Sequence, residues 1–432
     1  MTMCLSLGGD RARHPVPALE PGREDKLGYK QPVKTYRTLS SSFDWRDDRL
    51  EWPVTSEVGP GLAGVVATTT QVMWLDPASG SLAYRGEPVE TLAASRSFEE
   101  VAYLLITGLQ PEHEPDAWAA FRAQLRSSRT LPTEVVALIR DLSGKTHPTR
   151  QLRAGISALG CHELSVDGDL AGDRHWREFR LLGQVAAVVA EVASHRAGRD
   201  TPTFGDDDSL ATSILTSLNG RAPEGEDAAL LDLLWVLYAA HGLDAPTFTS
   251  MVVASCQADP YFNMVAGLSA LRGPRQGGAT EAVMEQLSAL DDPADARALV
   301  ARILDAGLPV AGFGHRIYRM PDPRVVILRR ELAALARRRR RPEVFEAARA
   351  IEIAATAALA PRGVHVNINF YAAPIFALLG AEAALGPCLF AVGRTAGLVA
   401  LVREAMDTIR LVRPLSRYVG PAERRLKGPR SS

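Results

Sequence analysis

Cysteine is scarce in this sequence, and its few residues lie far apart. The 432-residue chain holds four cysteines, and none of them forms a Cys-x-x-Cys pair or a Cys/His cluster with metal-site spacing. This scatter argues against the usual zinc motifs and against a fold stapled by disulfides, and it is typical of a reducing compartment. We therefore expect no metal site and a cytoplasmic location.

Charge bias and long apolar runs are also missing. The formal net charge is −1, so no excess of basic residues favours nucleic acid or an anionic membrane surface. The apolar stretch Leu181–Ala190 is short, and the longer one near the C-terminus is interrupted by Glu382 and Arg394. We expect neither stretch to span a bilayer, and the N-terminus shows no apolar core of a secretory signal.

Aromatic residues make up only 6% of the chain, whereas alanine and leucine are abundant. This composition favours helices over strands, and the length predicts two or three domains. Residues 1–56 differ from the remainder because prolines such as Pro15, Pro17 and Pro32 interrupt every helical pattern. We interpret this segment as an N-terminal extension that is flexible or loosely docked, with a partner-binding arm as the alternative.

Local patterns place several elements in the rest of the chain. Ser97–Glu100 is a capping box, and Leu230–Ala240 is apolar on nearly every side, which indicates a buried helix. Residues 325–335 carry leucine and valine at helical spacing and lead into the basic run Arg337–Arg341. We interpret this run as a solvated helix end rather than a phosphate site. Thr68–Tyr84 predicts a small hairpin.

The first segment that suggests chemistry is the glycine-containing loop Gly312–Asp322. Its glycines allow unusual backbone conformations and would hold His315 in a fixed place. Asp322 as cap and Pro323 at the first helical position predict the start of the next helix. From such a loop, His315 and Arg324 would both reach one cluster of anionic oxygens, although a lone loop histidine is more often structural or exposed.

Three other segments carry groups that suit an anionic ligand. The pair Gly277 and Gly278 opens a helix, where exposed backbone N–H groups suit an anion, although an ordinary helix start explains the pair equally well. Asn369 stands near another helix start, and capping is its simpler interpretation. Arg394 lies in apolar sequence and, like Arg413, needs an anionic partner, which a structural ion pair or a ligand would supply.

These four segments, in this order and spacing, resemble the citrate synthase family. The resemblance runs from about Gly59 to Gly420, and the G-F-G-H…D-P-R signature is its most specific part. It implies a mostly α, two-domain helical fold around a cleft, in a homodimer. The large domain would comprise residues 57–271 and 377–432, and the small domain residues 272–376.

The resemblance also implies an activity and a set of site residues. It implies an acyltransferase that condenses an acyl-CoA with a 2-oxo dicarboxylic acid such as oxaloacetate, with the CoA thioester as co-substrate and no permanently bound cofactor. His315 matches the histidine that polarises the ketone, and His241 matches the second histidine of the family's H-A-D-H-E motif. Three arginines match the carboxylate-binding residues, one of them supplied by the partner subunit, and their forks suit carboxylates: Arg324, Arg394 and Arg413.

The acyl-CoA side departs from the family pattern. Gln276 stands at the position of the catalytic histidine, and Asn369 at that of the catalytic aspartate. Tyr238 and Ala240 replace the first histidine and the aspartate of H-A-D-H-E. In the family, the aspartate removes a proton from the acyl group. An asparagine amide has no basicity near neutral pH, whereas Gln276 keeps the ability to donate a hydrogen bond to the thioester oxygen.

Three functions are compatible with these residues. The first is an enzyme with a different donor, such as malonyl-CoA, whose enolate forms by loss of CO₂ and needs no base. The second is a catalytically inactive homologue that binds a dicarboxylate or acts as a dimer partner. The third is an ordinary citrate synthase with a displaced base, for which His365 is a candidate. All three predict a small-molecule ligand and neither nucleic acid nor a membrane as partner.

Overall fold

The computed structural model describes residues 61–62, 65–162, 176–205, 208–407 and 410–414. Within these ranges the chain forms 16 α-helices and one three-stranded sheet, so the predicted mostly helical fold is confirmed. Contacts divide the chain into two compact units, residues 1–67 and 68–432. The predicted extension over residues 1–56 lies outside the described residues, and the split into a large and a small domain stays a prediction.

A small sheet forms at the start of the second unit. β1 (Met73–Leu75) pairs antiparallel with β2 (Leu82–Tyr84), and β2 pairs antiparallel with β3 (Glu87–Pro88). Gly80 takes a φ of +75° in the turn between β1 and β2, a conformation that glycine adopts without strain. The predicted hairpin is therefore confirmed, and a third short strand extends it.

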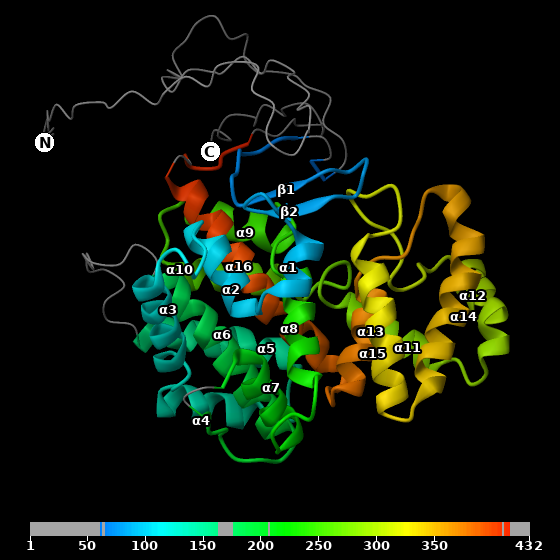
Figure 1. The fold of residues 1–432 in the computed structure, drawn as a ribbon, viewed down its shortest axis with the longest axis horizontal. Helices are drawn as coiled ribbons and strands as arrows, with labels where there is room; N and C mark the ends of the chain where they lie inside the picture. The colour runs from blue at the N-terminus through cyan, green and yellow to red at the C-terminus, as the bar shows by residue number, and fades with distance from the viewer. Residues whose placement is uncertain (1–60, 63–64, 163–175, 206–207, 408–409, 415–432) are drawn as a thin grey trace, which may run out of the picture. The chain divides into compact units, whose positions relative to one another are not determined.

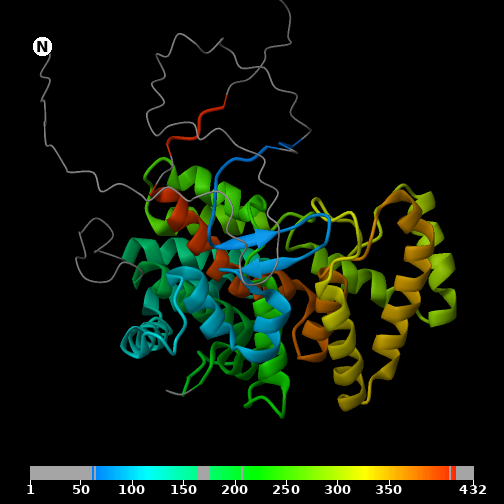
Figure 2. The ribbon, with the colours of Figure 1, turned by 45° about the horizontal axis from the view of Figure 1, so that its top comes forward.

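Helices make up most of the second unit. The first ten are α1 (Val89–Ser95), α2 (Phe98–Thr107), α3 (Pro115–Ser127), α4 (Thr133–Leu142), α5 (Pro148–His162), α6 (Trp176–Arg196), α7 (Leu210–Asn219), α8 (Asp227–Tyr238), α9 (Ala245–Ala254) and α10 (Pro260–Leu271). The others are α11 (Ala279–Ser288), α12 (Ala296–Asp305), α13 (Arg324–Arg338), α14 (Pro342–Leu359), α15 (Asn369–Leu378) and α16 (Gly386–Met406). Figures 1 and 2 show α11 to α15 grouped together.

Two of the predicted helices form as their sequence signals indicate. At the start of α2, the Ser97 hydroxyl accepts from the backbone N–H of Glu100, and the Glu100 carboxylate accepts from the N–H of Ser97. This reciprocal pair satisfies two N–H groups that have no partner inside the helix. Helix α8 is buried along most of its length, with Leu234 and Trp235 fully enclosed.

Helix α16 forms the core of the unit. It packs against α2, α6, α8 and α9, and Figures 1 and 2 show it, in red, running between other helices. A Cβ on Gly393 would come within 2.9 Å of Trp235, and one on Gly397 within 2.3 Å of the Ala239 carbonyl oxygen. Because these positions lack side chains, the end of α8 can lie directly against α16. This close approach positions the residues that follow α8 beside those of α16.

The apolar run near the C-terminus forms one helix that continues through the charged residue Arg394. Ala383–Met406 is long and apolar enough to cross a membrane by length and composition, and its apolar window is entirely buried inside the protein. Arg394 lies within the continuous helix α16, so the charge that cuts the apolar run in the sequence does not break the helix. The buried position explains the composition, because a helix enclosed by other helices is apolar all round.

The start and end of α13 differ from the sequence expectation. Its leucines are buried as predicted, but the helix begins at Arg324 with Pro323 as N-cap, one residue later than expected. The Asp322 carboxylate accepts from the Arg324 N–H, and its oxygens also bind the guanidinium of that residue. The basic end is not simply solvated, because Arg338 and Arg339 both form ion pairs with Asp227 at the start of α8.

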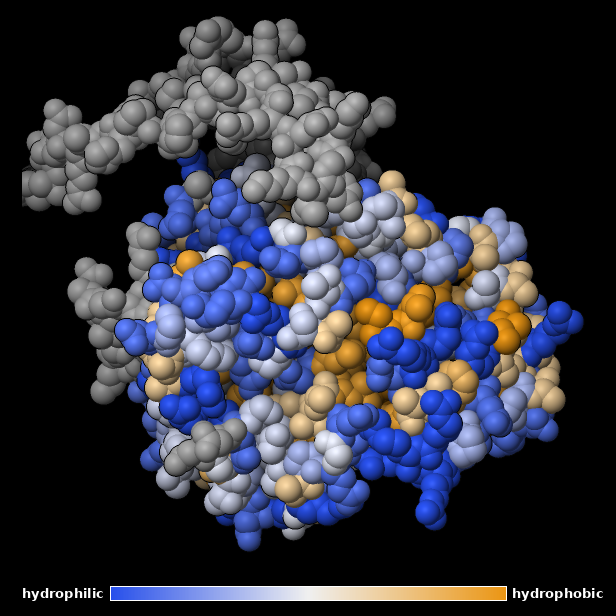
Figure 3. Space-filling view, viewed as in Figure 1, coloured by the Kyte–Doolittle hydropathy of each residue, from blue (hydrophilic) through white to orange (hydrophobic). Residues whose placement is uncertain are grey.

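The surface near the junction of α8 and α13 is apolar. In the space-filling view, apolar side chains gather between the positions that α8 and α13 occupy in Figure 1, on a face that is otherwise largely hydrophilic (Figure 3). Asp322 and Arg324 at this junction are themselves buried, and charges interact more strongly in the protein interior than in water.

Candidate active site

Two glycines shape the loop that carries His315. Gly312 and Gly314 have φ values of +75° and +90°, in the left-handed region that favours glycine. A Cβ on Gly312 would also come within 2.7 Å of Phe370, so a larger residue does not fit there. The Asn367 N–H donates to the Gly312 carbonyl oxygen at 2.9 Å, and its Nδ2 donates to that of Gly314 at 2.9 Å. These contacts fix the loop against the start of α15.

His315 uses one ring nitrogen to hold its own loop. Nδ1 accepts from the backbone N–H groups of Ile317 and Tyr318 at 3.1 and 2.9 Å. An accepting Nδ1 places the proton of the neutral ring on Nε2. Burial, together with the positive charges of Arg324 and Arg394, lowers the pKa of His315 to about 4. The ring is therefore neutral near pH 7 and offers an Nε2–H donor.

His241 lies beside His315, just after the end of α8. The two ring centroids are 5.0 Å apart, and the Tyr318 ring packs 4.5 Å from His315 and 5.4 Å from His241. Burial, and then the charge of Arg324, lower the pKa of His241 well below its ordinary value. Among the described residues, His241 Nε2 and the Tyr318 hydroxyl are buried without a hydrogen-bond partner. Sixteen buried side-chain N and O atoms lack such a partner in the described residues, and these two belong to rings that contact each other, which makes the cluster a candidate binding site.

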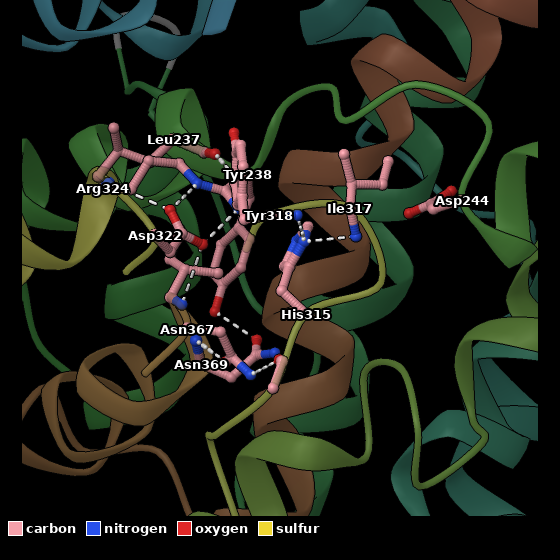
Figure 4. Close-up of polar contacts among 12 residues, drawn as sticks. Leu237, Tyr238, Asp244, His315, Ile317, Tyr318, Asp322, Arg324, Asn367 and Asn369 are labelled. Carbon is pink, nitrogen blue, oxygen red and sulfur yellow. Dashed lines mark hydrogen bonds and ion pairs between the residues drawn. The ribbon is translucent and has the colours of Figure 1, made fainter. Parts of the chain in front are cut away.

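Arg324 is held by its own loop and by α8, as Figure 4 shows. Nε and Nη2 donate to the two carboxylate oxygens of Asp322 at 2.9 and 2.8 Å, and Nη1 donates to the Leu237 carbonyl oxygen at 3.0 Å. Burial by itself would raise the pKa of Asp322, but the Arg324 guanidinium holds it below its ordinary value. Arg324 therefore lies close enough to both histidines to lower their pKa values, but its bidentate fork is already bound to an aspartate.

Arg394 projects from α16 and pairs with an aspartate that the sequence analysis missed. Its Nη1 lies 2.9 Å from Oδ2 of Asp244, and the guanidinium lies over the Phe390 ring, 5.0 Å from its centroid. Its Nε is buried without a hydrogen-bond partner in the described part of the chain. Asp244 is the N-cap of α9, and its sequence signal indicates only a helix start.

Asn369 begins α15 and is bound by Tyr238 at the end of α8. The phenol O–H of Tyr238 donates to Oδ1 of Asn369 at 2.9 Å (Figure 4). The backbone N–H of Asn369 donates to Oδ1 of Asn367 at 3.0 Å, so Asn367 provides the capping contact at this helix start. Two residues that depart from the family pattern, Tyr238 and Asn369, are thus bonded to each other. With Oδ1 engaged, the Asn369 amide N–H groups make no hydrogen bond to another residue in the described part of the chain.

Gln276 lies in the loop before α11. Gly278 is the N-cap of that helix, so the predicted Gly-Gly helix start is confirmed. The Nε2 of Gln276 donates to Oδ2 of Asp244 at 2.9 Å. The same carboxylate oxygen therefore contacts Gln276 and Arg394, and Asp244 links the acyl-CoA side of the predicted site to its oxo-acid side.

The structure does not bring Arg413 to the other predicted residues. Arg413 is exposed, its Nη1 donates to the Pro414 carbonyl oxygen at 2.9 Å, and no hydrogen bond or ion pair joins it to the other six within the described ranges. His365 is half-buried, and its backbone carbonyl accepts from the Gly314 N–H at 2.7 Å. Tyr318 and Asp244 are the residues that sequence reasoning missed, because each resembles an ordinary core or capping residue.

The site combines two neighbouring neutral histidines, two buried arginines that each pair with an aspartate, and buried polar atoms without a hydrogen-bond partner in the described residues. These residues form a candidate site for a small anionic ligand in a mostly helical protein. A family model described as citrate synthase, C-terminal domain, matches residues 61–415. The chain belongs to the citrate synthase family, which confirms the resemblance seen in the sequence.

Relatives match over nearly their full lengths. The citrate synthase of Deinococcus radiodurans is 31% identical over 365 residues, which cover 84% of this chain and 96% of the relative. The 2-methylcitrate synthase 2 of Corynebacterium glutamicum is 34% identical over 383 residues, which cover 86% and 97%. The structure of Thermoplasma acidophilum citrate synthase in a ternary complex with carboxymethyl coenzyme A and oxaloacetate has a TM-score of 0.80 and 28% identity, over 87% of this chain and 99% of that chain.

Proposed function

We propose that this protein condenses an acyl-CoA with a 2-oxo acid at the site around His241 and His315. The observation that carries the proposal is that three of the buried atoms without hydrogen-bond partners in the described residues belong to this one site: His241 Nε2, the Tyr318 hydroxyl and Arg394 Nε. These atoms suit the carboxylate and ketone oxygens of an oxo acid. Family membership supports the reaction class, and the T. acidophilum relative holds a CoA derivative and oxaloacetate.

His315 is the proposed electrophilic group of the reaction. Its Nε2–H would donate to the ketone oxygen, where negative charge develops as the new carbon–carbon bond forms. A pKa of about 4 keeps the ring neutral, so this donor is present at physiological pH. The proton of Nε2 would pass to that oxygen as the alcohol forms. The imidazolate left behind, whose Nδ1 accepts from two backbone N–H groups, would regain a proton from water.

The proposed donor is a carboxylated thioester such as malonyl-CoA, because Asn369 cannot act as a base. The bond between the α-carbon and the carboxylate breaks, CO₂ leaves, and the electron pair forms the enolate. The amide N–H groups of Asn369 and the second Nε2–H of Gln276 would stabilise the enolate oxygen. The α-carbon then attacks the ketone carbon of the oxo acid.

The experiment is a mass-spectrometric screen of the purified full-length protein. Acetyl-CoA, propionyl-CoA and malonyl-CoA are each offered with oxaloacetate and with 2-oxobutyrate, and the products are detected as a CoA adduct or as free acid and CoA. We expect a product from malonyl-CoA, and when its free carboxylate carries an isotope label, that label should leave as CO₂. The His315→Ala variant should form no product.

The other outcomes identify the alternative functions. Equal turnover of acetyl-CoA would show that a displaced base, such as His365, removes the proton. Binding of an oxo acid without product from any donor would support the inactive homologue that acts as a binding protein or dimer partner.

The proposed assembly is a homodimer in which Arg413 of one chain completes the site of the other. Its support is the exposed position of Arg413 and the family resemblance. Light scattering at micromolar concentration should give the mass of two chains. A stable monomer that still binds the oxo acid with an Arg413→Ala change would contradict this assembly.

A further inference from the structure

Asp244 joins three parts of the structure through one carboxylate. Oδ1 accepts from the backbone N–H of Thr247 at 3.0 Å and caps α9. Oδ2 lies 2.9 Å from Arg394 Nη1 and 2.9 Å from Gln276 Nε2. The side chain is only 13% exposed, so these contacts hold the negative charge in a fixed place inside the site.

This carboxylate changes the charge that the site offers to an acceptor. The two buried arginines of the site each face one aspartate, Arg324 with Asp322 and Arg394 with Asp244. Each arginine is thus largely neutralised before any ligand binds. A ligand carboxylate placed at either arginine meets an aspartate of the same charge a few ångströms away, and such repulsion is strong in a buried site.

The two ion pairs leave unequal room for a ligand. The Asp322 carboxylate engages Arg324 through both of its oxygens. Asp244 contacts Arg394 through one oxygen, and Arg394 Nε remains without a hydrogen-bond partner in the described residues. One carboxylate can therefore bind at the open edge of Arg394. A second carboxylate would have only the proposed Arg413 of the second chain as an unpaired cation, and it would still lie close to the charge of Asp244.

We infer that Asp244 is a specificity-determining residue that disfavours a second carboxylate on the acceptor, so that the site prefers a 2-oxo acid with one carboxylate. This inference rests on the proposed function and narrows its acceptor. It concerns affinity for the acceptor rather than the chemical step, since Asp244 acts through the charge that it places beside Arg394.

Two acids of equal carbon number separate the effect of charge from that of size. 2-Oxobutyrate carries one carboxylate, and oxaloacetate carries two on a chain of the same length. Their dissociation constants are measured by calorimetry on the full-length protein, with freshly prepared oxaloacetate at fixed ionic strength. We expect the wild type to bind 2-oxobutyrate more tightly, and Asp244→Asn to shift the ratio of the two constants at least tenfold towards oxaloacetate.

Two variants serve as controls. Asparagine caps helices about as well as aspartate, so Asp244→Asn keeps the start of α9. Asp259→Asn makes the same change at the N-cap of α10, where the carboxylate accepts from backbone N–H groups of Tyr261 and Phe262, and it should leave the ratio unchanged. Asp244→Glu keeps the charge and should keep the preference for 2-oxobutyrate.

The outcomes separate this inference from the proposed function. The inferred specificity is overturned if the wild type binds oxaloacetate more tightly and Asp244→Asn changes the ratio of the two dissociation constants by less than threefold. The proposed function would then still stand. A shift of equal size in Asp259→Asn also overturns the specificity, because the effect would then belong to any lost surface charge. Binding of neither acid by any of the folded proteins removes the proposed function, and the specificity with it.

Discussion

The two halves of the candidate site differ in how their polar groups are satisfied. The oxo-acid half consists of His241, His315, Tyr318, Arg324 and Arg394, and the donor half of Tyr238, Gln276 and Asn369. In the oxo-acid half, buried atoms of three residues have no partner among the described residues. In the donor half, Tyr238 bonds Asn369, and Gln276 bonds Asp244. The grouped atoms without partners support the oxo-acid half as the proposed ligand site, whereas the substituted residues of the donor half are bonded to other residues of the site.

The largest expected effect comes from restoring the family residues in the donor half. The double change Gln276→His with Asn369→Asp should increase release of free CoA from acetyl-CoA and a 2-oxo acid by at least about 100-fold, because general acid–base groups contribute about 10²–10⁴-fold. A thiol-release assay measures the rate for both proteins.

The single variants are the controls for this experiment. Each alone should gain less than the double variant, since groups that act as a unit are not additive. A high rate in the unaltered protein would show that another residue is the base. No gain in a folded double variant that binds the oxo acid would mean that the donor half has changed beyond these two positions.

The next effect concerns the stability of the oxo-acid half. Arg324→Leu leaves the buried Asp322 carboxylate without its partner and should lower the free energy of unfolding by about 3–5 kcal/mol. Gln276→Leu removes a partly exposed contact and should cost no more than about 1 kcal/mol. Denaturant unfolding measures both. The double change Asp322→Leu with Arg324→Leu should recover part of the lost stability. Equal losses in Arg324→Leu and Gln276→Leu would contradict the expected difference between the two halves.

Acid should destabilise the protein through the histidines of the oxo-acid half. The pKa of His315 is about 4 in the folded protein and 6.5 in its ordinary state, so between these values the unfolded chain binds more protons. The stabilisation that comes from keeping His315 neutral in the folded protein is therefore fully present above about pH 6.5. It is lost as the pH falls towards 4, which lowers the free energy of unfolding by at most about 3 kcal/mol.

His315→Asn is the matched variant for this pH dependence. An asparagine Oδ1 can accept from the Ile317 and Tyr318 N–H groups in place of Nδ1, but it does not titrate. Unfolding measured at several pH values should show a shallower slope between pH 6.5 and 4 for this variant. Identical slopes would show that His315 does not contribute to the acid sensitivity.

The smallest effect compares two tyrosines, one from each half. Tyr238→Phe removes the donor to Asn369 Oδ1 and should lower the free energy of unfolding by about 1 kcal/mol. Tyr318→Phe removes a hydroxyl that has no partner in the described residues, so it should leave stability unchanged or raise it, and weaken oxo-acid binding. Thermal unfolding with and without the acid measures both. A larger loss of stability in Tyr318→Phe than in Tyr238→Phe would contradict the view that the Tyr318 hydroxyl is unsatisfied and the Tyr238 hydroxyl is bonded.

The sequence by itself determined the local structure of this protein. The Ser97 capping box, the hairpin turn at Gly80 and the Gly277-Gly278 helix start depend on contacts between residues close in the chain. The G-F-G-H motif likewise determined the His315 loop, because only glycine fits its left-handed positions. These short-range requirements leave a direct pattern in the sequence.

Only the tertiary structure decided which polar groups meet. Tyr238 and Asn369 are 131 positions apart, and Asp244 and Gln276 are 32 apart, so no local pattern predicts either pair. Asp244 reaches Arg394 because Gly393 and Gly397 allow α8 to end directly against α16. The sequence showed that an arginine in apolar surroundings needs an anionic partner. Whether that partner is an aspartate or a ligand depends on how the helices pack, because a charge acts on whatever lies within a few ångströms of it.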